Sequence, residues 1–219
     1  MFGFFKTKKN KIVERNTTNL KISVVMPVYL GEYEGCADNR IERFKSAVIS
    51  FVNQSYKNSE LIIISDGCNI AEMIYNDCLV YDNIVFKKIP KQSLFSGNVR
   101  AEGVKIASGD IIGYLDSDDN IGKHHLQTIV DNFTTKPALD WVYYNDIIAI
   151  PKYPITTREV HLALGFIGTS TIAHRKDCEV SWIGCDNYNH DWLFIQKLIA
   201  YSNSYIKIYG ATYYVNHIK

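Results

Sequence analysis

The sequence predicts an α/β fold in which a mixed, mostly parallel sheet is flanked by helices. Short β-branched runs alternate with segments of helical periodicity through the first half of the chain. Acidic residues directly follow several of these runs, at the place where open α/β sheets bind ligands. The 219 residues can build one substantial core but are few for two independent domains.

The first elements follow one another closely. The run at 21–28, KISVVMPV, suits a buried parallel strand, and residues 40–53 carry apolar side chains at helical spacing. A second apolar run at 60–65 precedes a short helix at 70–76, so a right-handed parallel crossover is expected.

The alternation then continues and loosens beyond Pro137, where mixed or antiparallel pairing is expected. The remaining elements are predicted as strand 84–89, helix 98–107, strand 110–115, helix 123–133, strands 141–145 and 147–150, a loop around Pro151 and Pro154, strand 169–174, helix 192–201 and strand 205–215.

Charge and cysteine content narrow the class of protein. The chain has 24 Lys and Arg and 23 Asp and Glu, a formal net charge of +1. A net charge this small does not attract nucleic acid to the protein as a whole. The five cysteines lack a C-x-x-C pair or zinc-ligand spacing, and we expect reduced thiols in a cytoplasmic protein. No apolar run reaches the length of a membrane span.

Residues 1–19 are predicted to form a flexible lead before a single domain at 20–219. The lead begins MFGFFKTKKNK, so its phenylalanines and lysines can give weak contact with an anionic membrane surface. A frayed, solvated tail is the favoured interpretation.

The stretch GYLDSDDN places Asp116, Asp118 and Asp119 directly after a buried run. Carboxylates this close repel unless a cation or several donors lie among them, and Mg²⁺ and Mn²⁺ prefer such oxygen ligands. A D-x-D by itself favours a simpler interpretation, in which Asp118, Asp119 and Asn120 cap the next helix.

A phosphatase of the haloacid dehalogenase type is a second alternative, because its nucleophile also lies in a D-x-D after a strand. That motif has Thr or Val two residues past its second Asp and lies at the first strand. Here position 120 is Asn and the cluster follows several strands.

Four ordered blocks carry a more specific signal: ISVVMPVYLGE (22–32), SFVNQSYKNSELIIISDG (50–67), VRAEGVKIASGDIIGYLDSDD (99–119) and NHDWLFIQKL (189–198). Together they resemble glycosyltransferase family 2, the inverting enzymes of GT-A fold, over about residues 21–217. The resemblance implies a nucleotide-binding half at about 20–120 and an acceptor-side half at about 138–219.

The resemblance also implies a nucleotide site. Asp66 matches the aspartate that binds the base, usually uracil, although the family's Asp-Asp-Gly-Ser is Ser-Asp-Gly-Cys here. Arg100 matches an arginine near the phosphates, but the Asn that usually follows it is Ala101. The other implied nucleotide-binding residues are Pro27, Val28, Tyr29, Glu32, Asp116 and Ser117.

For the metal, the family implies Asp118 as the direct ligand of Mn²⁺ or Mg²⁺, with Asp119 as support or as a simple cap. His217 matches a histidine that often completes the metal site, and a purely structural histidine stays equally open. His124 and His125 follow the acidic cluster, but their place on the next helix favours a solvated surface.

Asp191 matches the general base of the family's Glu-Asp motif, with His190 in place of Glu. Without the family, His190-Asp191-Trp192 is only a helix start. The resemblance implies a hexosyltransferase-like enzyme that moves a sugar from a nucleotide diphosphate sugar, expected to be a UDP-sugar, to a hydroxyl of a glycan, a lipid-linked sugar or another acceptor.

Two alternatives remain open. The changes to His190 and Ala101 keep a non-catalytic sugar-nucleotide-binding or interaction module in consideration. A nucleotidyltransferase of related fold is less favoured, because the loop at 29–35 lacks the basic residues of a phosphate loop.

Overall fold

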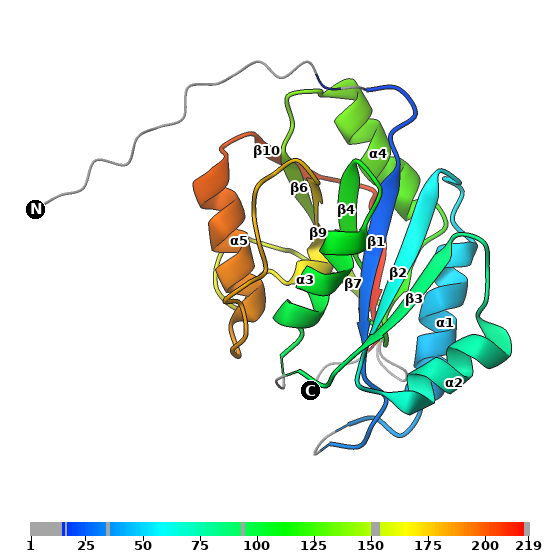
Figure 1. The fold of residues 1–219 in the computed structure, drawn as a ribbon. Coiled ribbons are helices and arrows are strands. Elements are labelled where there is room, and N and C mark those ends of the chain that lie inside the picture. The colour runs from blue at the N-terminus through cyan, green and yellow to red at the C-terminus, as the bar shows by residue number, and fades with distance from the viewer. Residues whose placement is uncertain (1–14, 16, 34–35, 93–94, 150–153, 217–219) are drawn as a thin grey trace, which may run out of the picture.

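The computed structural model describes residues 15, 17–33, 36–92, 95–149 and 154–216. Helices cover both faces of a central sheet, with α1 and α2 on one face and α3 and α5 on the other (Figure 1). The predicted contact of residues 1–14 with a membrane surface lies outside the described residues. Within the described part of the chain, no helix has the length and apolar character needed to cross a membrane.

The helices are α1 (Arg40–Val52), α2 (Asn69–Cys78), α3 (Gly97–Ile106), α4 (His125–Thr135) and α5 (His190–Tyr201). The strands are β1 (Ile22–Val28), β2 (Ser59–Asp66), β3 (Ile84–Ile89), β4 (Ile111–Tyr114), β5 (Asn120–Ile121), β6 (Trp141–Tyr144), β7 (Asp146–Ile148), β8 (Thr156–Arg158), β9 (Ile172–Arg175), β10 (Tyr205–Ile208) and β11 (Tyr213–Val215).

The seven-stranded central sheet has the order β10-β6-β9-β4-β1-β2-β3. Neighbouring strands among β4, β1, β2 and β3 pair in parallel, and β1 pairs with β2 from Ile22 opposite Ser59 to Val28 opposite Ser65. All eight residues of β2 are buried, as expected of a strand covered on both faces. Because these strands run the same way, their carboxyl ends meet at one edge of the sheet.

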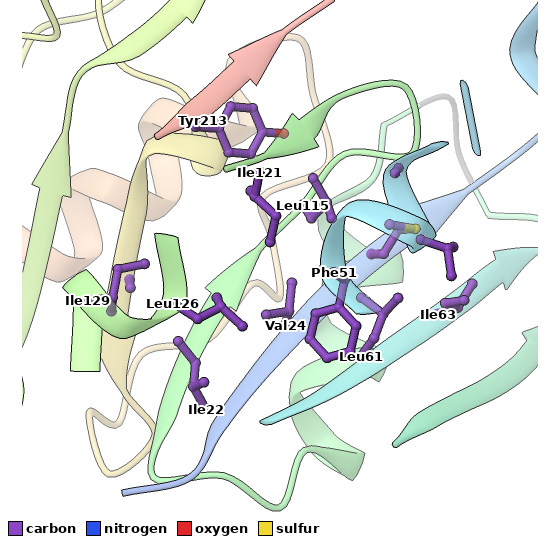
Figure 2. Packing of buried hydrophobic residues seen from close by; sticks show 14 of the residues in the cluster. Ile22, Val24, Phe51, Leu61, Ile63, Leu115, Ile121, Leu126, Ile129 and Tyr213 are labelled. Carbon is purple, nitrogen blue, oxygen red and sulfur yellow. The ribbon is translucent and has the colours of Figure 1, made fainter. Parts of the chain in front are cut away.

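Alternate residues of the central strands build two cores. Val24 and Leu61 face the helices α1, α2 and α4, whereas Val25 and Ile62 face α3 and α5. Figure 2 shows the first core, in which Phe51 of α1 and Leu126 of α4 lie near Ile22, Val24 and Leu61. The helical spacing predicted from the sequence therefore faces the sheet.

The second half of the chain departs from the parallel pattern, as predicted. Strand β9 lies between β4 and β6 and is antiparallel to both. A smaller sheet has the order β5-β11-β7-β8, in which β5 and β8 have only two and three residues and were not predicted. The backbone at 169–171 is a 3₁₀-helix rather than the predicted start of a strand.

The predicted final strand at 205–215 is wrong as a single element. It breaks at Gly210, whose φ of +86° lies in the left-handed region that glycine adopts without a Cβ penalty. Strand β10 ends the central sheet beside β6, and β11 crosses to the small sheet between β5 and β7. This crossing brings the C-terminal segment beside the acidic turn after β4.

Glu60 of β2 links its strand to β1 and to the loop that precedes β4, at the end of the sheet opposite the acidic turn. Its carboxylate accepts hydrogen bonds from Lys21 Nζ at 2.8 Å, Ser23 Oγ at 2.6 Å and Ser108 N at 2.7 Å. Although burial alone raises its pKa, the hydrogen bonds from Lys21, Ser23 and Ser108 lower the pKa of Glu60 to about 2.

We predict that Glu60→Gln lowers the free energy of unfolding by about 1–3 kcal/mol at pH 7, because charged hydrogen bonds are lost in a buried place. The folded pKa lies below the unfolded value, so this stabilisation is present above about pH 4.5 and is lost as the pH falls toward 2. Denaturant titrations at several pH values measure it. The exposed Glu159→Gln is the control and should change stability by less than about 0.5 kcal/mol. The prediction would be contradicted if Glu60→Gln lowered the free energy of unfolding by the same amount near pH 2 as at pH 7.

Candidate functional site

The candidate site lies where the parallel strands end. Tyr29 follows β1, Asp66 ends β2 and Asp116 follows β4 by two residues, so all three lie at one edge of the central sheet. This is the place where open α/β sheets bind ligands, because loops there vary while the sheet holds their ends.

Asp66 is buried and forms an ion pair with Lys91, a residue that was not predicted from the sequence. Its Oδ2 accepts a hydrogen bond from Lys91 Nζ at 2.5 Å, and its Oδ1 accepts one from the backbone N–H of Gln92 at 2.6 Å. The Lys91 ammonium also lies 4.6 Å from the centre of the Tyr29 ring. A carboxylate, an ammonium and a ring face together offer the groups that a planar heterocycle binds.

The loop after β1 is held by α1. Arg40 donates hydrogen bonds to the carbonyl oxygens of Tyr29 and Gly31, and its guanidinium lies 4.7 Å from the centre of the Tyr33 ring. The backbone of Pro27 and Val28 is part of β1 at this edge. Glu32 is exposed on the loop and makes no hydrogen bond or ion pair with another described residue.

Arg100 of α3 is 3% exposed and lies between two carboxylates. Its Nη2 donates to Asp116 Oδ1 at 2.6 Å, and its Nη1 lies 3.8 Å from Asp191 Oδ1. It also donates to Ser96 Oγ, and its guanidinium carbon lies 5.4 Å from the centre of the Trp182 ring. Although burial opposes the charge, Asp116 and Asp191 raise the pKa of Arg100.

Asp116 carries a large electrostatic perturbation. A third of its side chain is exposed, yet loss of hydration raises its pKa to about 6. Arg100 opposes this shift, whereas Asp119, Asp118 and Asp191 add to it by repulsion. Ser117 and Asp118 follow on the turn and are both half-buried.

Of the two roles left open for Asp119, the structure excludes the helix cap, because α4 begins at His125. Asp119 is 3% exposed and accepts hydrogen bonds from Tyr213 Oη at 3.0 Å and from the backbone N–H of Asn216 at 2.9 Å. Tyr213 Oη in turn accepts a hydrogen bond from the backbone N–H of Asp116 at 3.0 Å. Asp119 therefore fastens the acidic turn to the C-terminal segment.

The wider capping interpretation of the acidic cluster is also wrong, because α4 begins at His125 and Asn120 belongs to β5. The prediction that His125 lies on a solvated surface is wrong. His125 is 2% exposed and packs edge-on against Tyr144 with ring centres 5.1 Å apart, and burial lowers its pKa to about 3. His124 is exposed, as expected.

Asp191 lies in the first turn of α5, with its carboxylate held from several sides. Thr169 Oγ1 donates to Asp191 Oδ1, and His190 Nε2 lies 3.2 Å from the same oxygen. Its Oδ2 lies 3.6 Å from the position that a Cβ on Gly168 would occupy. Through Arg100, the structure brings Asp116 and Asp191 together, although 75 residues separate them. Thr169 carries no motif by which the sequence could reveal its role.

A divalent cation fits the chemistry of the acidic turn. Asp116 and Asp118 supply the carboxylate oxygens that Mg²⁺ and Mn²⁺ prefer, and repulsion from Asp118 and Asp119 helps to raise the pKa of Asp116, after the larger effect of burial. Within the described residues, no group of three or more His, Cys, Asp or Glu side chains is arranged to hold a metal ion. His217, the predicted further ligand, lies outside the described residues.

Comparison with known proteins supports the fold and the family resemblance. A family model described as Glycosyl transferase family 2 matches residues 23–199. An uncharacterized glycosyltransferase of Haemophilus influenzae is 36% identical over 107 residues, covering 48% of this chain and 39% of that protein. The poly(ribitol-phosphate) beta-N-acetylglucosaminyltransferase TarP of Staphylococcus aureus is 30% identical over 112 residues, covering 50% of this chain and 32% of TarP.

Solved structures show the same architecture. S. aureus TarS 1–349 in complex with UDP has a TM-score of 0.67 at 19% identity, covering 90% of this chain and 61% of that one. The complex of TarS 1–349 with UDP-GlcNAc has the same TM-score and covers 91% of this chain and 59% of that one. These likenesses confirm the predicted GT-A fold. The chain spans less than two thirds of the length of each of these proteins.

We predict that Tyr213→Phe destabilises the protein by about 1–3 kcal/mol, because Asp119 loses a buried donor and the Asp116 N–H loses its acceptor. Denaturant unfolding measures this loss. Tyr214→Phe is the matched control, because Tyr214 is half-buried and donates no hydrogen bond to another described residue. Equal stability of the two variants would contradict the bracing role of the Tyr213 hydroxyl.

Proposed function

Because the chain belongs to glycosyltransferase family 2, we propose that it transfers a sugar from a UDP-sugar to a hydroxyl acceptor, with inversion at the anomeric carbon. The observation that carries the proposal is the position of Arg100 between Asp116 and Asp191. A displacement reaction needs a stabilised leaving group and a base on opposite sides of the reacting carbon. One buried guanidinium links the side chains proposed for these two tasks.

The base and ribose of the donor are assigned to the edge formed by β1, β2 and the segment after β3. Asp66 accepts from the base, Lys91 offers a donor beside it, and Tyr29 offers a ring face. Backbone of Pro27, Val28 and Tyr29 completes this pocket, and Glu32, Asp116 and Ser117 lie toward the ribose and phosphates. The crystallised complexes of TarS 1–349 with UDP and UDP-GlcNAc support a uridine donor.

Asp118 is the proposed ligand of Mg²⁺ or Mn²⁺, with Asp116 beside it and His217 as a further candidate. When bound, the ion neutralises negative charge on the diphosphate. Arg100 contributes fixed positive charge at the same place and needs no reorganisation during the reaction.

Asp191 is the proposed general base. As the acceptor oxygen bonds to the anomeric carbon, the acceptor O–H proton moves to the Asp191 carboxylate. The bond from the anomeric carbon to the diphosphate oxygen breaks, and its electron pair leaves with UDP. Positioned general base catalysis contributes roughly 10²- to 10⁴-fold. Thr169 and Arg100 hold the carboxylate during this transfer.

The acceptor is a hydroxyl group of a glycan, a lipid-linked sugar or a related molecule, bound on the side of residues 138–216. All five cysteines are free, which supports a reducing compartment such as the cytoplasm.

A non-catalytic UDP-sugar-binding module is the second candidate, because His190 and Ala101 depart from the family pattern. Metal-dependent release of UDP from a UDP-sugar distinguishes the enzyme from such a module.

Asp191→Asn is predicted to retain UDP affinity within about twofold while lowering UDP release from a UDP-sugar by at least roughly 10²-fold, because the base is lost and the nucleotide contacts remain. Calorimetry and a UDP-release assay measure the two quantities. Asp186→Asn, an exposed neighbour, is the control. Transfer at the wild-type rate in the Asp191 variant would refute the base assignment.

The proposed donor site predicts that UDP-sugars with Mn²⁺ raise the melting temperature of the protein, because a ligand that binds only the native state stabilises it. In Asp118→Ala, the part of this shift that depends on Mn²⁺ should disappear. Asp131→Ala on the outer surface of α4 should keep it. The donor-site proposal fails if a panel of UDP-, GDP-, TDP- and CMP-sugars with Mn²⁺ or Mg²⁺ gives no shift with the unaltered protein.

A further inference from the structure

The ring of His190 is held on both of its nitrogens. Nδ1 lies 3.1 Å from the carbonyl oxygen of Asn187, and Nε2 lies 3.2 Å from Asp191 Oδ1 and 3.4 Å from Ser96 Oγ. The ring of Phe95 covers it, with ring centres 5.8 Å apart. Only 17% of the His190 side chain is exposed, so few orientations are open to it.

These contacts define the tautomer of the neutral ring. The Asn187 carbonyl and the Asp191 carboxylate are both acceptors, but only the contact of Nδ1 with Asn187 is a hydrogen bond, whereas that of Nε2 with Asp191 is a charge contact, so the proton of the neutral ring is placed on Nδ1. Nε2 of neutral His190 then carries a lone pair. The hydroxyl of Ser96 can donate to that lone pair while its oxygen accepts the hydrogen bond from Arg100.

The contact between His190 Nε2 and Asp191 Oδ1 therefore joins two hydrogen-bond acceptors when both groups are unprotonated. A proton on Nε2 turns the contact into an ion pair between the imidazolium and the Asp191 carboxylate. The pair thus favours the state with one added proton. That is the state that a base reaches when it deprotonates an acceptor hydroxyl.

We propose that His190 is a positioning residue for Asp191, and that the two side chains accept the acceptor's proton as an electrostatically coupled pair. The inference rests on the proposed role of Asp191 as base. After transfer, the pair carries one additional proton, which it loses to water as UDP and the product leave. No oxidant, reductant or further reactant takes part.

The charges around His190 set the direction of its titration. Asp191 on α5 faces Nε2, Arg100 approaches from α3, and the Asn187 carbonyl faces Nδ1. Burial lowers the pKa of His190, and although Asp191 and Asn187 oppose this, Arg100 adds to it. At low pH the pair already holds its proton and cannot accept another, so the reaction rate should rise with pH, with a midpoint below about 6.5.

The direct test is nitrogen NMR of histidine-labelled protein, which needs neither a donor nor an acceptor. We expect neutral His190 to carry its proton on Nδ1, and its pKa to fall by roughly one unit in Asp191→Asn, because a facing carboxylate is removed. His124 is exposed and is the internal control, because its nitrogen signals should be the same in both proteins. A proton on Nε2 of neutral His190, or an unchanged pKa in the variant, overturns the proposal.

The kinetic test compares His190→Gln with the unaltered protein in release of UDP from UDP-GlcNAc with Mn²⁺. A glutamine amide is a hydrogen-bond donor at every pH and does not take up a proton. We expect turnover to fall roughly 10- to 100-fold, and the acid midpoint to move down by about one unit or more. If the midpoint of the rate profile at low pH is the same in His190→Gln as in the unaltered protein, the pairing is refuted. The fall in rate at low pH then belongs to another group, and Asp116 is the first candidate.

Two controls separate the pairing from the proposed function. His124→Gln should leave turnover and pH profile unchanged. Asp191→Asn tests the base itself, so wild-type turnover in that variant refutes the proposed base. If Asp191→Asn loses turnover but His190→Gln keeps the pH dependence of the unaltered protein, only the pairing is refuted.

Discussion

A single buried guanidinium, that of Arg100, lies between the carboxylates on which the site depends. A buried charge is costly unless it is paired, and Arg100 is paired with Asp116 at 2.6 Å and approaches Asp191 at 3.8 Å. These three side chains come from α3, the end of β4 and the start of α5. The packing of α3 and α5 on one face of the sheet therefore sets the spacing between the proposed leaving-group side and the proposed base.

The acidic turn divides its carboxylates between structure and ligand binding. Asp119 is satisfied by Tyr213 and Asn216, so its charge anchors the turn to β11. Asp116 pairs with Arg100, yet burial together with the repulsion of its neighbours keeps its pKa near 6. A cation at this turn would relieve that repulsion, which is why the proposed metal site is assigned to Asp118 and Asp116 rather than to Asp119.

The sequence predicted most of the parallel half of the fold, because strands buried on both faces are continuous apolar runs, and β3 has the bounds expected from its run. Asp66, Asp116 and Asp191 were found through motifs, although their roles remain proposals. Lys91, Ser96 and Thr169 escaped notice because their partners are distant in sequence or lack a pattern. The burial of His125 and the crossing of β11 depend on tertiary packing, which local periodicity does not encode.

The two departures from the family pattern differ in physical character. Ala101 is buried among apolar residues of the core that α3 shares with the sheet, so its small side chain serves packing. His190 instead meets a specific partner at each ring nitrogen, Asn187 at one and Asp191 with Ser96 at the other. Neither change breaks the link from Asp116 through Arg100 to Asp191. A module that only bound a UDP-sugar would have no need of a carboxylate held so closely by Thr169, Arg100 and His190, and this favours a catalytic role.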